Sequence, residues 1–260
     1  MFDQGVTLPT VNVLGSRIHL IQLHDVTSQM SRWIQRNERR CRQIVVTGFH
    51  GIWEAYQDGN FRHVLNSADL WIPDGIAPVW IARLKGFPNA IRTPGVDLMR
   101  AFFETAAVEG YSNFFYGDTK NTLAGLQKNL KTEYPELQIV GAFSPPFKTL
   151  TREEDDEIIE MINKAKPDVL WVALGLPKQE QWIFEHRDRL NVPVAVGVGA
   201  AFGFLSGRVK HAPNWLGNLG LEWLYRLIHE PKKLWRRDFI DGPRFVWHVL
   251  CEFAKLKSPH

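Results

Sequence analysis

The sequence has little of what disulfide-bonded, zinc-binding or membrane-spanning proteins need. Its 260 residues include only two cysteines, Cys41 and Cys251, which lie far apart and form no Cys-x-x-Cys motif. A disulfide framework and a zinc site are not indicated, and a reducing compartment fits best. No apolar run approaches the roughly 18 residues that are needed to cross a bilayer. The N-terminus does not show the basic segment followed by an apolar segment that is typical of a signal peptide. We therefore expect a cytoplasmic or peripheral protein.

Motifs that bind metal ions are also missing. The chain has no Asp-x-Asp motif, and His50, His186 and His211 are scattered. The acidic run at 153–157 is interpreted as the first turn of a helix, because Thr151 opens a capping box and the helix dipole favours acids there. The sequence predicts no metal site and no cofactor.

The charge of the chain is unevenly distributed. Its formal net charge is +3, yet residues 208–260 hold ten lysines and arginines, five acids and four of the ten tryptophans. A basic segment rich in tryptophan is typical of a membrane interface. We predict a catalytic domain over 1–207 and a C-terminal helical appendage over 208–260 that contacts an anionic membrane surface. The small net charge does not favour nucleic-acid binding.

Part of this appendage has apolar residues at helical spacing. They occur at positions 221, 224, 227 and 228, and Pro231 is expected to break or kink the helix. Basic residues cluster just after it. The same pattern fits a helix that packs on the core and exposes a basic face, so both interpretations stay open.

Strand-like and helix-like segments alternate before the appendage. One or two short strands are expected within 11–22, another short strand at 70–73, and further strands at 43–47, 113–117, 138–143, 168–174 and 193–198. Helices are expected at 25–35 with Asp25 as a candidate N-cap, after a loop at 48–51 to about 66, and at 76–85, 96–109, 152–165 and 178–190. A further helix is expected to run to about 134, with either Asp118 or Thr119 as its N-cap. This alternation predicts an α/β protein, with a Rossmann-like, mostly parallel sheet flanked by helices.

Polar residues and glycines follow four of these strands. They are Thr47-Gly48, Asp74-Gly75, Gly117-Asp118 and the run from Gly175 to Gln179. Ordinary turn chemistry explains any one of them. Because the carboxyl ends of parallel strands share one edge, where helix N-termini present free N–H groups, the four together predict a cleft for a phosphate-bearing ligand.

Asp74 is the best candidate for a catalytic residue. It follows the apolar strand 70–73, so its carboxylate is expected at the floor of the cleft, where it can act as a general base. The alternative is a structural role as N-cap of the helix at 76–85.

The run from Gly197 to Gly203 suggests a second kind of site. Its spacing is Gly-x-Gly-x-x-x-Gly, which differs from the dinucleotide fingerprint, and no acidic residue follows at 217–220 to hold a ribose. A tight turn that lines the same cleft is favoured. A nicotinamide-dependent oxidoreductase is kept as an alternative function, and a non-catalytic peripheral membrane protein as another.

Five motifs carry a family likeness: Ile72-Pro-Asp-Gly75, Arg92-x-Pro-Gly-Val-Asp-Leu-Met99, Gly175-x-Pro-Lys-Gln-Glu180, Gly197-Val-Gly-Ala-Ala-Phe202 and Gly220-Leu-Glu-Trp-Leu-Tyr-Arg226. Through them the chain resembles the WecG/TagA/CpsF family of bacterial glycosyltransferases over about residues 11–250. The resemblance implies an inverting, metal-independent enzyme at the inner face of the cell membrane. Such enzymes transfer a sugar from a UDP-sugar to a saccharide on polyprenyl diphosphate, for a surface polysaccharide or teichoic acid. A homo-oligomer is possible.

The resemblance also implies roles for individual residues. The proposed base of the family falls on Asp74, and its substrate-site residues fall on Thr47, Arg92 and Gln179. The basic residues thought to meet the lipid diphosphate are implied at Arg226, Lys233 and Arg236, with Lys233 in place of an expected arginine. The glycine turns add Gly117 and Gly199 to the expected substrate site.

Two departures from the family pattern concern the donor sugar. Family members usually have Thr-x-Asn where this chain has Thr47-Gly-Phe-His50, and often an Asp where this chain has Gly203. Either His50 does the work of the asparagine or the sugar contact differs. The donor therefore stays open between UDP-N-acetylmannosamine and another UDP-sugar, such as UDP-glucose.

Overall fold

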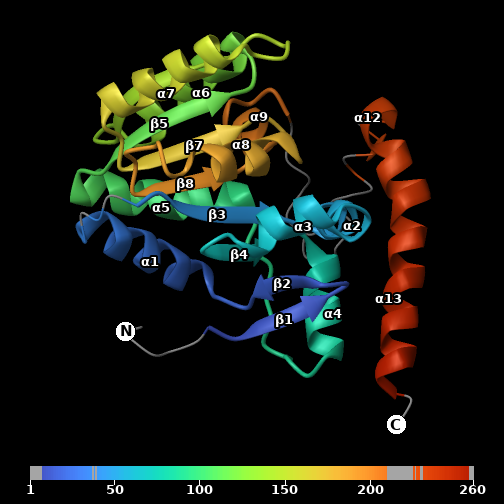
Figure 1. Cartoon of the computed structure of the whole chain (residues 1–260). Helices are drawn as coiled ribbons and strands as arrows, with labels where there is room; N and C mark the ends of the chain where they lie inside the picture. Colours follow the sequence, from blue (N-terminus) through green and yellow to red (C-terminus); the bar gives the residue numbers. More distant parts are fainter. Residues whose placement is uncertain are drawn as a thin grey trace.

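A parallel sheet of six strands forms the centre of the protein (Figure 1). The computed structural model describes residues 8–36, 38, 40–209, 225, 227–228 and 231–257. The strands lie in the order β4-β3-β8-β7-β5-β6 and all pair in parallel. Their bounds are β3 (Arg42–Thr47), β4 (Leu70–Pro73), β5 (Ser112–Gly117), β6 (Gln138–Phe143), β7 (Val169–Ala173) and β8 (Val194–Gly197). The predicted fold class is confirmed.

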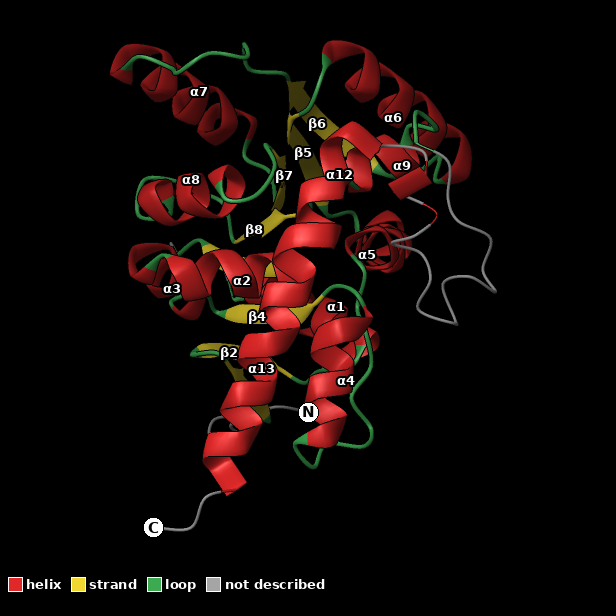
Figure 2. Cartoon of the chain, turned by 90° about the vertical axis from the view of Figure 1, so that its right-hand side faces the viewer, coloured by secondary structure: helices red, strands yellow, loops and turns green. Residues whose placement is uncertain are grey.

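Helices cover both faces of this sheet, as Figure 2 shows. One face carries α2 (Phe49–Gln57), α3 (Gly59–Asn66), α7 (Arg152–Ala165) and α8 (Lys178–His186). The other carries α1 (Leu23–Gln35), α5 (Gly95–Glu109), α6 (Lys120–Glu133) and α9 (Ala201–Leu205). Because both faces are covered, β3, β4, β5, β7 and β8 are almost entirely buried and lack an apolar–polar alternation.

A small antiparallel hairpin lies beside the main sheet. It consists of β1 (Thr10–Val13) and β2 (Ser16–His19), which confirms the short strands expected near the N-terminus. The Nδ1 atom of His19 accepts a hydrogen bond of 3.0 Å from the Trp71 backbone N–H, which ties the hairpin to β4. The helix α4 (Ile76–Leu84) follows β4.

The C-terminal helices pack on the α/β unit. They are α12 (Pro231–Arg236), a π-helical turn η1 (Arg237–Asp241) and α13 (Gly242–Lys257), and α13 stands beyond the carboxyl edge of the sheet (Figures 1 and 2). Phe245 and Val249 of α13 are buried in the same core cluster as Ile52 and Trp53 of α2. Among the described residues, no helix is long and apolar enough to cross a membrane.

Polar contacts fix α13 at its other end. A Glu252 carboxylate oxygen accepts a hydrogen bond of 3.2 Å from the Leu14 backbone N–H. The other Glu252 oxygen lies 3.1 Å from the ammonium of Lys85, which follows α4. In both views α4 lies beside α13 (Figures 1 and 2). The described part of the C-terminal segment therefore shares a core with the sheet and its helices.

Several predicted helix ends were wrong. Helix α1 begins at Leu23 with Gln22 as N-cap, so Asp25 lies in the first turn, where the helix dipole favours it. The predicted loop at 48–51 is mostly helical, because α2 begins at Phe49. Asp58 ends α2 and caps α3, since its carboxylate accepts from the N–H groups of Asn60 and Phe61.

The end of α8 also differs from the prediction, and the structure defines the start of α12. Helix α8 ends at His186 rather than near 190, because a turn follows in which Arg189 N–H donates to His186 O. Pro231 begins α12, a position where its missing N–H costs nothing. The predicted capping box of α7 is confirmed, with Thr151 and Glu154 bonded reciprocally.

The packing of α13 can be tested with a pair of neighbouring residues. Phe245→Ala removes a side chain that is 3% exposed and should lower the free energy of unfolding by about 3–5 kcal/mol in urea titrations. Val246→Ala, at a position that is 54% exposed, should change it by no more than about 0.5 kcal/mol. Equal effects of the two substitutions would show that α13 does not pack on the core in this way.

Candidate active site

The ends of β3 and β4 bring Thr47 and Asp74 side by side. Thr47 pairs with Pro73 in the sheet register, and the Asp74 backbone N–H donates a hydrogen bond of 3.1 Å to Thr47 O. Gly48 permits this approach, because a Cβ atom there would lie 2.2 Å from Asp74 O. The N-cap of α4 is Gly75, with φ +93°, so the alternative role of Asp74 as an N-cap is wrong.

Thr47 and His50 lie where β3 leads into α2. Thr47 is buried, and its hydroxyl lies against Gly51, where a Cβ atom would come within 2.3 Å of it. Burial lowers the pKa of His50, nearby carboxylates with Glu54 foremost oppose this, and Arg237 lowers the pKa further, so the neutral imidazole is favoured. Its Nδ1 atom lies 3.9 Å from Glu54 Oε1 and has no hydrogen-bond partner among the described residues. A neutral imidazole can donate or accept a hydrogen bond.

Arg92 lies in the loop that leads from α4 into α5. The next residue, Thr93, donates its backbone N–H to Pro73 O at 2.8 Å, which holds the half-buried Arg92 near the end of β4. Thr93 is fully buried, and its hydroxyl has no partner among the described residues. Gly95 begins α5 and lies close to Val198, just beyond β8. The N-terminus of α5 therefore faces the same edge as Asp74.

Gln179 lies in the first turn of α8, beside the end of β8. Its side-chain oxygen accepts from Gly175 N–H at 3.2 Å, and its amide nitrogen donates to Glu180 Oε1 at 2.8 Å. Cβ atoms at Gly197 and Gly199 would lie 3.0 Å and 3.5 Å from the Gln179 amide. Since β8 pairs with β3, the glutamine lies one strand away from the strand that ends at Thr47.

Gly117 lies farther along the edge, at the end of β5. Its φ is +120°, and a Cβ atom would lie 2.3 Å from the carbonyl oxygen of Ala173 in β7, so only glycine fits. Next to it is an open hollow of about 490 Å³. The hollow is lined by Thr119, Lys120, Phe143, Ser144, Pro145, Pro146 and Phe147. Gly117 therefore shapes the edge without contributing a side chain.

The sequence reasoning missed Arg208. Its guanidinium lies 2.9 Å from an Asp118 carboxylate oxygen and 3.0 Å from where a Cβ atom of Gly203 would be. A larger residue at 203 would have to displace it. An ion pair between positions 90 apart leaves no local pattern in the sequence, so only the fold reveals it.

Of the three basic residues expected to meet the lipid diphosphate, only Arg236 has a described side chain. It is exposed at the end of α12. Lys233 lies within α12 with its side chain outside the described residues, and Arg226 lies outside them altogether. The predictions missed Arg237, whose guanidinium lies 5.8 Å from the Phe49 ring. That ring also contacts Phe245, with 5.7 Å between centroids, so α2 joins the site to the C-terminal helices.

Comparison with known proteins assigns the chain to a family. The profile of the Glycosyl transferase WecG/TagA/CpsF family matches residues 11–259. The chain belongs to this family. It is a glycosyltransferase, as the sequence motifs indicated.

Curated relatives of this glycosyltransferase share one name. The N-acetylglucosaminyldiphosphoundecaprenol N-acetyl-beta-D-mannosaminyltransferase of Bacillus spizizenii is 35% identical over 80% of the chain and 78% of the relative. The Bacillus subtilis protein of that name is 33% identical over 78% and 77%, respectively. The Staphylococcus aureus protein is 29% identical over 76% and 75%.

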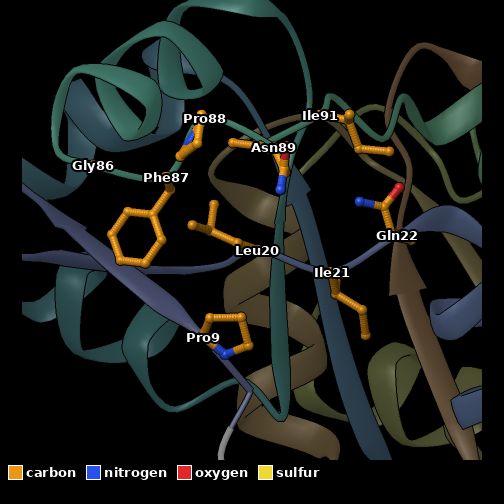
Figure 3. A pocket seen from close by; sticks show the side chains of 10 residues that line it. Pro9, Leu20, Ile21, Gln22, Gly86, Phe87, Pro88, Asn89 and Ile91 are labelled. Carbon is orange, nitrogen blue, oxygen red and sulfur yellow. The ribbon is translucent and has the colours of Figure 1, made fainter.

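This glycosyltransferase has another hollow, which none of the predicted site residues lines. It measures about 220 Å³ and lies between the start of α1 and the loop after α4 (Figure 3). Leu20, Ile21, Phe87 and Pro88 are among the mainly apolar side chains around it. Among the described residues, no three His, Cys, Asp or Glu side chains gather as a metal site would require.

Proposed function

We propose that this glycosyltransferase moves a sugar from a UDP-sugar to a polyprenyl-diphosphate-linked saccharide, with inversion at the anomeric carbon. The observation that carries the proposal is the placement of Asp74 beside Thr47, at the edge that the α5 N-terminus also faces. Ligands bind at this edge in open α/β sheets. In this proposal, residues 1–207 form the catalytic domain and residues 208–260 the appendage that meets the lipid-linked acceptor.

Asp74 is the general base of the proposed reaction. An acceptor hydroxyl attacks the anomeric carbon of the donor sugar, its proton passes to the Asp74 carboxylate, and the bond to the departing UDP oxygen breaks. Asp74 is half-buried, which limits the water that competes for its oxygens. Thr47 and Gln179, on neighbouring parts of the edge, hold the sugar for in-line attack.

The charge on the departing diphosphate needs a counterpart. The first N–H groups of α5 have no partner within the helix and suit an anion. Arg92 lies three residues before α5 begins and adds a positive charge. These groups can take the place of a metal ion, so the proposed transfer needs none.

The acceptor is proposed from the relatives and from the C-terminal helices. The relatives are named for acting on an N-acetylglucosamine carried by undecaprenyl diphosphate. Five large apolar side chains of the C-terminal helices are more than half exposed: Trp235, Phe239, Val246, Trp247 and Leu250. Together with the basic Arg236 and Arg244, they suit the inner face of an anionic membrane. In this proposal Arg226, Lys233 and Arg236 of the appendage meet the lipid diphosphate.

The donor sugar is proposed as a UDP-linked hexose or N-acetylhexosamine. The relatives are named for N-acetylmannosamine, which makes UDP-N-acetylmannosamine the first candidate. Family members usually have an asparagine two residues after the threonine. In this chain His50 lies three residues after Thr47, and we propose that it takes the place of that asparagine. Its neutral ring can form a hydrogen bond with the sugar, as an amide would.

Substitution of the proposed base tests the mechanism. In transfer assays with a UDP-sugar and a polyprenyl-diphosphate-linked acceptor, Asp74→Asn should lower kcat by about 10²–10⁴-fold and leave UDP affinity nearly unchanged. The matched control is Asp58→Asn, because asparagine still caps α3 and this carboxylate lies outside the site. Unchanged turnover in Asp74→Asn would exclude Asp74 as the base.

A second pair of variants tests the membrane surface. The double variant Trp247→Ser with Leu250→Ser removes exposed apolar side chains of α13 and should reduce sedimentation with anionic liposomes at least about tenfold. Val108→Ser with Met161→Ser changes exposed apolar residues of α5 and α7 and should have no effect. Liposome binding that is the same in both double variants contradicts a membrane role for α13.

A further inference from the structure

A carboxyl group without solvent contact lies directly behind the proposed sugar site. Glu180 follows Gln179 in the first turn of α8 and is 0% exposed. Burial raises the pKa of Glu180 to about 8, although a hydrogen bond from Gln179 opposes the increase. The side chain is therefore mostly neutral at pH 7 and ionises close to pH 8.

The oxygens without a hydrogen-bond partner around Glu180 fit the neutral form. Its Oε1 atom accepts from the Gln179 amide at 2.8 Å, while Oε2 is buried and has no partner among the described residues. Gln43 of β3 lies beside it and donates its amide to the Glu180 backbone oxygen at 3.0 Å. The side-chain oxygen of Gln43 also lacks a partner there. Two such acceptors need a donor, and a proton on Oε2 supplies one.

The charged residues on the elements around α8 are engaged elsewhere. Arg42 of β3 forms ion pairs with Glu38 and Asp69. On α3, His63 packs its ring edge-on against Phe184, and the side chain of Arg62 lies beside Gly15. β8 has no charged residue, and on α8 itself Lys178 and Glu185 are not among the causes of the pKa of Glu180.

Two more residues that can carry a charge lie at the C-terminal end of α8. His186 is bonded to Asp155 of α7, and Arg187, the C-cap, donates to the backbone oxygen of Ser67. An ionised Glu180 would therefore be a buried charge with no described countercharge, which is costly in a protein interior.

We propose that Glu180, in its neutral form, is a positioning residue that fixes the amide of Gln179 toward the donor sugar. This inference rests on the proposed function. The Gln179 oxygen is held by Gly175 N–H and one amide hydrogen is held by Glu180, so the amide cannot flip without losing both bonds. The second amide hydrogen has no partner among the described residues and is left for a sugar oxygen. Ionisation of Glu180 would place an uncompensated buried charge directly behind this amide, and the surrounding groups would have to rearrange to solvate it.

The pH dependence of catalysis tests the inference. Transfer by the unchanged protein should fall as pH rises through about 8. Glu180→Gln keeps an acceptor for the Gln179 amide and a donor in place of the carboxyl proton at every pH. It should therefore remain active at pH 7 and lose the decline near pH 8. The control Glu185→Gln, an exposed position on the same helix, should behave as the unchanged protein. An unaltered decline in Glu180→Gln, or loss of activity at pH 7 in the folded variant, overturns the inference.

A second variant separates positioning from folding. Glu180→Leu removes the acceptor of the Gln179 amide, and KM for the UDP-sugar should rise about fivefold to tenfold, the loss expected for one hydrogen bond. Circular dichroism verifies that the variant is folded. An unchanged KM in folded Glu180→Leu overturns the positioning role, whereas Glu180→Gln should restore the original KM.

Stability gives a readout that does not depend on catalysis. The folded protein keeps the Glu180 proton that the unfolded chain releases near its ordinary pKa of 4.5. Stability should therefore decrease, relative to Glu180→Gln, as pH rises from about 4.5 to 8. If the difference in Tm between the two proteins stays constant across this pH range, the inference is overturned. A protein that shows this difference but transfers no sugar from any UDP-sugar contradicts the proposed function instead.

Discussion

The hydrogen bond from the Asp74 backbone N–H to the carbonyl oxygen of Thr47 joins the two strand ends on which the site depends. It requires that the loop after Thr47 approach Asp74 closely, which Gly48 permits because it has no Cβ atom. A hydrogen bond from Thr93 to Pro73 then brings the start of α5 to the same place. The side chains of the candidate site are therefore positioned by strand pairing and by hydrogen bonds between backbone groups.

The C-terminal helices contact the helix that follows Thr47. Helix α2 begins two residues after Thr47, and its first residue, Phe49, contacts both Arg237 and Phe245. The same helices expose tryptophan, phenylalanine and leucine on their outer surface. A segment that packs on α2 with one side and exposes apolar groups on the other fits the proposed link between a membrane surface and the proposed sugar site.

Much of the fold could be predicted, because apolar runs such as 169–174 and the capping box at Thr151 are local signals. The strand ends and the family motifs also pointed to Asp74, Thr47 and Gln179. The first turn of α2 was missed, since Gly48 and Gly51 favour a loop by composition, yet a Cβ atom at either would collide with Asp74 or Thr47. The Arg208–Asp118 pair, the Arg237–Phe49 contact and the burial of Glu180 depend on residues distant in sequence, which no local pattern encodes.

Binding and turnover of nucleotide sugars test the central claim most directly. The protein is titrated in a thermal-shift assay with UDP, UDP-N-acetylmannosamine, UDP-glucose and NAD, and the UDP-sugars are then offered with a lipid-linked acceptor. At 100 times its Kd a ligand stabilises the folded state by about 2.7 kcal/mol, which raises Tm by several degrees. We expect UDP to raise Tm, NAD to leave it unchanged, and at least one UDP-sugar to be transferred. A rise with NAD and none with UDP would contradict the account.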